Sequence, residues 1–220
     1  MKKQKTRSIL LKNTKSKKWA CYTKPNMKNE VRRLATRPLQ ENEYREVIGL
    51  LIYGFQADGG ERRQPNPQIA MILQLQASIG LRISDVLELR VNNFRNGKLE
   101  TIEKKTKKIQ YRDVNPAIID LVKDYALKEG FTPEAKLFNI GVRAVQLQLK
   151  FVADHLGLTN IGTHSFRKMY ATEAYYGHGK DSRLVQELLN HSSSTQTERY
   201  IGINQRQIDQ ISRSMNFLIS

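Results

Sequence analysis

The chain has 220 residues, a hydrophobic content of 39% and a formal net charge of +16 at pH 7, which suits one sizeable domain with a short additional segment. No run of about 18 apolar residues occurs, so no membrane-spanning helix is expected, and no apolar stretch follows the basic N-terminus as in a secretory signal. A single cysteine, Cys21, excludes an internal disulfide, and no Cys/His cluster has zinc-site spacing. We therefore expect a cytoplasmic protein with no metal and no other cofactor.

The positive charge is concentrated at the N-terminus. Residues 1–33 contain 12 Lys and Arg and one acidic residue, Glu30, whereas the remainder holds 25 Lys and Arg against 20 Asp and Glu. Such a block is typical of a solvated arm that binds phosphates, although a tail that only increases solubility has the same composition. We predict that residues 1–35 form a flexible DNA-binding arm, with general DNA contacts from Lys2, Lys3, Lys5, Lys17 and Lys18.

From about residue 36 the pattern is that of one mainly helical domain. Apolar residues at helical spacing predict long helices over 39–55, 68–79, 116–129, 141–156 and 164–176. Shorter helices are expected over 84–89, 181–190 and 194–200. Ser84 is the expected N-cap of the first of these. Gly and Pro residues predict a loop over 56–67.

Two further segments have a distinct pattern. Residues 97–114 alternate in the manner of two short strands around the basic turn Lys104 to Lys108, which predicts a β-hairpin. Residues 204–220 carry Ile208, Ile211, Met215 and Leu218 on one helical face, which predicts an amphipathic tail helix. The expected fold class is thus mainly α with a small antiparallel β-sheet, and the domain extends over 36–220.

Several polar residues in this domain are suited to chemistry on a phosphate. His164 and Arg167 lie three positions apart, so a helix presents both on one face. An arginine offers a planar, permanently charged fork for phosphate oxygens, and two of them would neutralise the charge of a pentacoordinate transition state. Arg82, just after Gly80, is the second such arginine. A hairpin lysine can protonate a leaving oxygen, and a tyrosine hydroxyl can attack phosphorus to form a covalent ester.

Each of these residues also has an ordinary explanation. Arg82 and Asp85 would suit a surface ion pair, and the lysines of the hairpin would suit a solvated turn. His191 can cap a helix, and Tyr200 is one of nine tyrosines, most of which belong to cores or interfaces. The combination and its order therefore carry more weight than any single position.

The combination resembles the tyrosine recombinases, the family of phage integrases. That family places Arg, Lys, His-x-x-Arg, His or Trp, and Tyr in this order. Gly80 to Asp85 (Gly-Leu-Arg-Ile-Ser-Asp) resembles its first box, and Thr163 to Arg167 (Thr-His-Ser-Phe-Arg) its second. Leu188 to Ser192 resembles Leu-Gly-His-Ser, with Asn190 in the place of the common Gly. The spacings also fit, since 23 positions separate Arg82 from Lys105 and nine separate His191 from Tyr200. The resemblance covers roughly residues 36–205.

The resemblance implies the following catalytic roles. The phosphate would be bound and polarised by Arg82, His164, Arg167 and His191. Tyr200 would take the 3′ phosphate and release a 5′ hydroxyl. Lys105 would be the general acid because the family lysine usually precedes the Thr or Gly of the turn. Its rivals, which otherwise serve as general DNA contacts, are Lys104, Lys107 and Lys108. Asp85 would support the site, and we expect it to pair with an arginine.

The resemblance further implies a function and its partners. The expected function is site-specific DNA recombination, acting on double-stranded DNA as a homotetramer. In the tetramer the tail helix would dock into a neighbouring protomer; the alternative is that it packs on its own domain. Only about 35 residues precede the domain, too few for the helical core-binding domain that most family members carry there. Either the basic arm or an accessory core-binding or DNA-bending partner would replace it, or the sequence is part of a longer protein. The alternatives are a type IB topoisomerase and a helical DNA-binding regulator without catalysis. No membrane partner is expected, and a location at the nucleoid is expected.

Overall fold

The computed structural model describes residues 35–177, 179–191, 193–194 and 197. They belong to the larger of the two units of the chain, Leu34–Ser220. The predicted nucleophile Tyr200, the lysines of the N-terminal arm and the tail helix over 204–220 all lie outside the described residues.

Seven α-helices are described, namely α1 (Glu41–Tyr53), α2 (Pro67–Ile79), α3 (Ile83–Val86), α4 (Pro116–Lys128), α5 (Val142–His155), α6 (Thr163–Gly177) and α7 (Ser182–Leu188). The strands form two antiparallel sheets, and their bounds are β1 (Phe55–Gln56), β2 (Arg62–Arg63), β3 (Phe94–Arg95), β4 (Lys98–Ile102) and β5 (Ile109–Asp113). A short 3₁₀ helix, η1, covers Val91–Asn93. The expected fold class, mainly α with a small antiparallel sheet, is confirmed.

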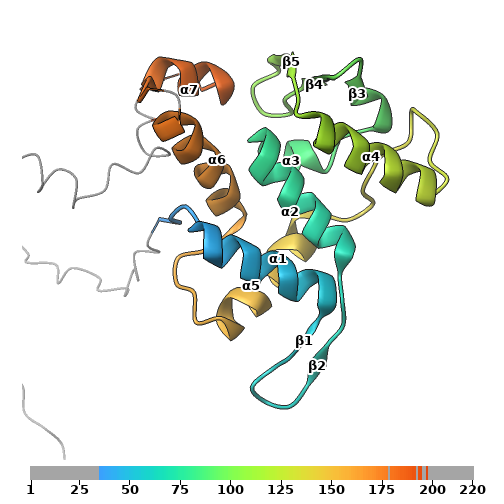
Figure 1. Ribbon diagram of the computed structural model, residues 1–220, viewed down its shortest axis with the longest axis vertical. Helices are drawn as coiled ribbons and strands as arrows, with labels where there is room; N and C mark the ends of the chain where they lie inside the picture. Colours follow the sequence, from blue (N-terminus) through green and yellow to red (C-terminus); the bar gives the residue numbers. More distant parts are fainter. Residues whose placement is uncertain (1–34, 178, 192, 195–196, 198–220) are drawn as a thin grey trace, which may run out of the picture. The chain divides into compact units, whose positions relative to one another are not determined.

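The core is built around α2, which contacts α1, α3 and α6 (Figure 1). Nearly every turn of α2 is buried, including Ile72, Leu73 and Leu75, because a helix that is apolar on all sides is stable only when neighbours surround it. Asn66 caps the start of α2 by accepting a hydrogen bond from the backbone N–H of Ile69 at 3.2 Å. Among the described residues, no helix is both long and apolar enough to span a membrane.

The five long predicted helices are confirmed, each to within two residues of its expected ends. The predicted N-cap Ser84 is wrong: α3 begins at Ile83 and its N-cap is Arg82, because Ile83 and Val86, three positions apart, are both buried in the core. Of the expected helix over 194–200, only residues 194 and 197 are described, and both are helical.

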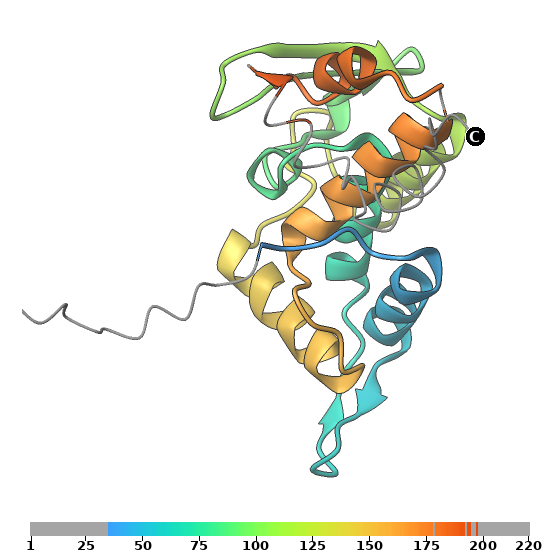
Figure 2. The ribbon, with the colours of Figure 1, turned by 90° about the vertical axis from the view of Figure 1, so that its left-hand side faces the viewer.

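The predicted loop over 56–67 is also corrected by the structure. It contains the short hairpin β1–β2, in which Phe55 pairs with Arg63 and Gln56 with Arg62. Figures 1 and 2 show this hairpin at the end of the unit opposite the three-stranded sheet. The sheet itself has the order β3-β4-β5, so the predicted hairpin carries one additional strand. In β4–β5 the register places Ile102 opposite Ile109, which leaves the basic residues in the connecting turn.

Candidate active site

The backbone of Gly80 brings the first predicted box against α6. Gly80 ends α2 in the left-handed conformation, with φ 64° and ψ 14°, which glycine adopts at little cost. A Cβ atom at this position would lie 2.3 Å from Cδ1 of Tyr170 on α6. Both the conformation and the contact therefore require glycine. Leu81, which follows, is fully buried, and Arg82 is thereby placed at the start of α3, next to α6.

Arg82 forms an ion pair with Glu103, a residue at the end of β4 that the sequence did not single out. The Glu103 side chain is fully buried and also accepts hydrogen bonds from Oγ1 of Thr106 at 2.7 Å and from Nε2 of Gln110 at 3.1 Å. Burial alone would raise the pKa of Glu103, but these hydrogen bonds and the charge of Arg82 outweigh it and lower the pKa. Glu103 is thus a carboxylate held in its charged form beside Arg82.

Asp85 lies on α3 and is 2% exposed. Its Oδ1 accepts a hydrogen bond from the backbone N–H of Lys104 at 2.9 Å, so the predicted supporting residue holds the start of the hairpin turn. The carboxylate that is bonded to Arg82 is instead that of Glu103. Among the described residues, Oδ2 of Asp85 has no hydrogen-bond partner. Burial and the nearby charge of Glu103 raise the pKa of Asp85 against the opposing effect of Arg82 and Arg167.

The hairpin turn carries the four candidate lysines, all with exposed side chains. Backbone hydrogen bonds close the turn, from Lys107 N to Glu103 O at 2.9 Å and from Glu103 N to Lys108 O at 3.0 Å. The amine of Lys104 donates to Glu88 at 3.3 Å. Lys105 is close enough to His164 to lower the pKa of that histidine, and Lys108 acts in the same way on His191. The predicted general acid therefore lies within electrostatic range of the α6 residues.

Helix α6 supplies His164 and Arg167. His164 is exposed at the start of the helix, whereas Arg167 is among the largest fully buried side chains. Nη2 of Arg167 donates to the backbone oxygen of Leu189 at 2.7 Å and lies 3.3 Å from Nε2 of His191. Partial burial and the charges of Arg167 and Lys168 lower the pKa of His164, so its imidazole is neutral at neutral pH.

His191 follows a left-handed residue after α7. Asn190 has φ 53°, a conformation that Asn tolerates better than most non-glycine residues, which explains how it replaces the common Gly. The His191 ring is 6% exposed, and its Nδ1 lies 3.0 Å from Oγ1 of Thr197. Burial, followed by the charges of Arg167 and Arg82, lowers the pKa of His191 to about 4. The imidazole is therefore a neutral hydrogen-bonding group beside two arginines.

Five predicted site residues from four separate segments of the chain are thus brought together: His164 is within electrostatic range of Arg82, Lys105 and Arg167, and His191 is within range of Arg82 and Arg167. A pocket of about 360 Å³ opens beside His191 and is lined in part by Lys108 and Arg183. Such a convergence of cations and neutral imidazoles suits binding of an anion such as a phosphate diester.

Four residues were missed by the sequence alone. Glu103 pairs with Arg82, Thr106 and Gln110 donate to Glu103, and Thr197 lies beside His191. The only sequence signal was the position of Glu103 and Gln110 on either side of the basic turn.

Comparison with known proteins places this geometry in a family. Residues 61–207 match the model of the phage integrase family. The chain is 34% identical over 132 residues to the probable integrase/recombinase YoeC of Bacillus subtilis (strain 168), covering 57% of this chain and 72% of YoeC. It is 31% identical over 158 residues to the tyrosine recombinase XerC of Myxococcus xanthus, covering 64% of this chain and 52% of XerC. The chain thus spans about half the length of this XerC relative.

Solved structures share the fold. XerA recombinase superimposes with a TM-score of 0.61 at 16% identity, over 84% of this chain and 66% of XerA. The catalytic domain of bacteriophage HP1 integrase gives a TM-score of 0.56 at 16% identity, over 81% of this chain and 95% of that domain. The family match covers two thirds of the chain and agrees with the positions of the boxes that resembled the family. The chain belongs to the phage integrase family, the tyrosine recombinases.

Proposed function

We propose that this protein is a site-specific DNA recombinase that cleaves and rejoins strands through a 3′-phosphotyrosine intermediate. The Tyr200 hydroxyl attacks the scissile phosphorus, a bond forms between the tyrosine oxygen and phosphorus, and the bond from phosphorus to the 5′ oxygen breaks. Attack by the 5′ hydroxyl of a second strand on the same phosphorus reverses the sequence and restores the tyrosine. Because one ester replaces another, the reaction needs no external energy source.

Each clustered side chain has a defined part in this proposal. Arg82 and Arg167 neutralise the charge that develops on the non-bridging oxygens. His191 donates a hydrogen bond to one of them. His164, neutral because its pKa is lowered, accepts the proton of the Tyr200 hydroxyl, and Lys105 gives a proton to the departing 5′ oxygen. His164 takes up one proton from Tyr200 and Lys105 gives one proton to the 5′ oxygen, so the protons balance.

The convergence of the five side chains carries the proposal. Arg82 comes from the start of α3, Lys105 from the hairpin turn, His164 and Arg167 from α6, and His191 from the segment after α7. The buried Arg167 lies beside the buried ring of His191, an arrangement that a surface ion pair or a solvated turn would not require. Cations gathered in this way suit binding of an anion such as a phosphate diester.

Trapping of a covalent adduct tests the proposal. A nicked suicide substrate loses the short strand with the 5′ hydroxyl, so the protein stays attached to DNA and migrates as an adduct after denaturation. We expect wild-type protein to form the adduct. Tyr200→Phe should retain DNA binding and form none, since it lacks only the hydroxyl. An adduct in the Phe variant would identify another nucleophile, with Tyr170, Tyr175 and Tyr176 the first to test.

Two assays separate the remaining activities. Strand exchange between two duplexes that carry the target site is expected of a recombinase, whereas relaxation of supercoiled DNA without exchange would identify a topoisomerase. DNA binding with no adduct on any substrate would identify a regulator. Among solved structures with this fold, XerH was crystallised with its difH substrate and lambda integrase with a core site, which supports double-stranded DNA as the partner and a location at the nucleoid.

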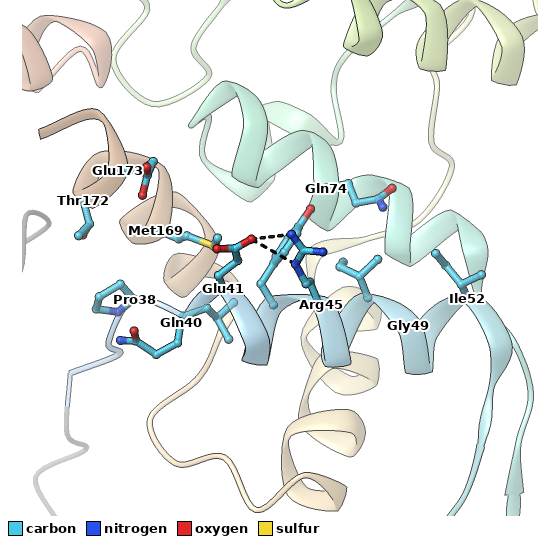
Figure 3. Close-up of a pocket in the computed structure, with 13 residues that line it drawn as sticks. Pro38, Gln40, Glu41, Arg45, Gly49, Ile52, Gln74, Met169, Thr172 and Glu173 are labelled. Carbon is cyan, nitrogen blue, oxygen red and sulfur yellow. Dashed lines mark hydrogen bonds and ion pairs between the residues drawn. The ribbon is translucent and has the colours of Figure 1, made fainter. Parts of the chain in front are cut away.

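We further propose that protomers assemble as a tetramer on synapsed DNA through residues 204–220. A groove of about 810 Å³ lies between α1, α2 and α6, and Figure 3 shows Ile52 and Met169 among the side chains that line it. The ion pair of Arg45 with Glu41, at 2.6 Å, lies along the same groove. An apolar helix face from a neighbouring protomer fits such a surface, because it would bury these carbon atoms while its polar face stays in water.

A further inference from the structure

Arg112 makes contacts with several parts of the site although it belongs to none of the sequence boxes. It lies on β5, opposite Leu99 of β4. Its Nη1 donates to the backbone oxygen of Leu188 at 2.9 Å, and its Nη2 donates to the backbone oxygen of Ile79. One guanidinium group thus joins two carbonyl groups that are more than a hundred residues apart in the sequence.

Both carbonyl groups end a helix, and each comes three residues before a proposed site residue. Ile79 is the last residue of α2 and precedes Arg82, and Leu188 is the last residue of α7 and precedes His191. The last carbonyls of a helix have no partner within it and carry the negative end of the helix dipole. A permanently charged arginine fork can cap two such ends at once, whereas a lysine offers a single point charge.

A third contact extends the connection to α6. The guanidinium carbon of Arg112 lies 5.6 Å from the centre of the Tyr170 ring, within the range of cation–π attraction. The same ring packs against Gly80 so closely that a Cβ atom there would clash. In addition, the side chain of Asn190 donates to Ile109 O, at the start of β5, at 3.4 Å. The hairpin, α2, α6 and α7 therefore meet around one side chain.

We infer that Arg112 is a positioning residue that sets the distance between Arg82 and His191, by capping the two helices from which these residues emerge. The inference rests on the proposed function of the site. Arg112 touches neither residue directly and acts through two three-residue segments, Gly80 to Arg82 and Leu189 to His191. Loss of the fork would let the two segments separate, and a misplacement of about 1 Å in a preorganised site costs on the order of a hundredfold in rate.

Arg112→Met tests this inference, since methionine retains the apolar stem and removes every donor. The matched control is Arg90→Met, which removes an arginine whose Nη1 also donates to a backbone oxygen, that of Glu134. We expect Arg112→Met to slow single-turnover adduct formation by about tenfold to a hundredfold with little change in half-site affinity, and Arg112→Lys to recover part of the rate. Thermal unfolding of each variant gives the folded fraction by which the rates are corrected.

Two readouts separate positioning from a general loss of stability. A 5′-bridging phosphorothiolate needs no general acid, so it should not restore the Arg112→Met rate if Arg112 acts through Arg82 and His191. NMR should show the titration midpoint of His191 moving from its wild-type value in Arg112→Met and staying constant in Arg90→Met. The inference is overturned if the sulfur substrate fully restores the rate of Arg112→Met. It is also overturned if the corrected rate and the His191 midpoint of Arg112→Met both equal those of wild type. A wild-type protein that forms no adduct refutes the proposed function, and the His191 midpoint still decides the role of Arg112.

Discussion

Arg82 and Glu103 form an ion pair in which the carboxylate is completely buried and the arginine side chain is 16% exposed. Thr106 and Gln110 donate to the same carboxylate, so the arginine is oriented by a group that the hairpin itself positions. The pair joins the start of α3 to the turn that carries Lys105. A phosphate that binds Arg82 thus meets a guanidinium group whose orientation is already fixed by the Glu103 carboxylate. The site is preorganised in this respect.

Glu103→Gln should destabilise the protein by about 1 to 3 kcal/mol, because it leaves Arg82 partly buried without its counter-charge. Urea unfolding measures the change. Glu88→Gln is the control, because Glu88 forms exposed ion pairs with Lys104 and Lys136, and such pairs contribute about 0 to 1 kcal/mol. Equal effects of the two substitutions would show that the buried pair does not stabilise the fold.

Lys105→Ala should slow cleavage far more than it weakens DNA binding, since the proposed role of Lys105 is proton transfer to the 5′ oxygen. A 5′-bridging sulfur leaves as a thiolate without protonation and should restore the rate. Lys104→Ala is a useful comparison because the Lys104 amine is bonded to Glu88. If the sulfur substrate instead restores the cleavage rate of Lys107→Ala or Lys108→Ala, the general acid has been assigned to the wrong position in the turn.

Stability without DNA should fall between pH 6.5 and pH 4. Burial and the neighbouring arginines lower the pKa of His191 from 6.5 to about 4 in the folded chain, so the unfolded chain binds more protons in this window and stability rises with pH. The contribution of neutral His191 to the free energy of unfolding is complete above pH 6.5 and disappears as the pH falls toward 4. It amounts to roughly 3 kcal/mol at most. His191→Gln should flatten this part of the profile, measured by urea unfolding. The same substitution at His155, which stacks on Phe55 outside the site, is the control for the loss of an imidazole elsewhere in the fold.

Removal of residues 1–33 should lower DNA affinity and reduce its dependence on salt. The segment holds 12 Lys and Arg and one acidic residue, and each phosphate contact contributes about 0.9 to the slope of log affinity against log salt. Fluorescence anisotropy at several salt concentrations measures the slope. A chain with residues 1–33 in scrambled order keeps the charge and should keep most of the slope. An unchanged slope after deletion would show that the arm does not contact DNA.

A chain that ends after residue 205 should bind a half-site but fail to assemble a tetramer on full-site DNA, as measured by light scattering. Gly49→Lys tests the proposed acceptor groove without removing the tail. Gly49 lies in that groove, and a Cβ added there meets no atom within 4 Å, so the lysine should fill the groove without disturbing the core. Gly49→Ala is the control. Normal tetramers in both Gly49→Lys and the truncated chain would exclude this mode of assembly.

Local sequence patterns determined the long helices and the order of the site residues. The spacing of apolar residues predicted α2, α4, α5 and α6 closely, because each of these helices buries one or more faces whose period is visible in the sequence. The hairpin was predicted for the same reason, since its strands alternate around a basic turn. The boxes around Arg82, Arg167 and His191 were recognisable because each depends on a few adjacent residues.

Tertiary structure alone decided which side chains support the site. Asp85 was the expected partner of an arginine, yet the carboxylate bonded to Arg82 is that of Glu103, 21 positions farther along the chain. The hydrogen bonds of Arg112 reach the ends of two helices that lie 33 and 76 positions away from it. Such partners are fixed by strand register and by helix packing over long sequence separations, and neither leaves a periodic pattern that can be read from the sequence.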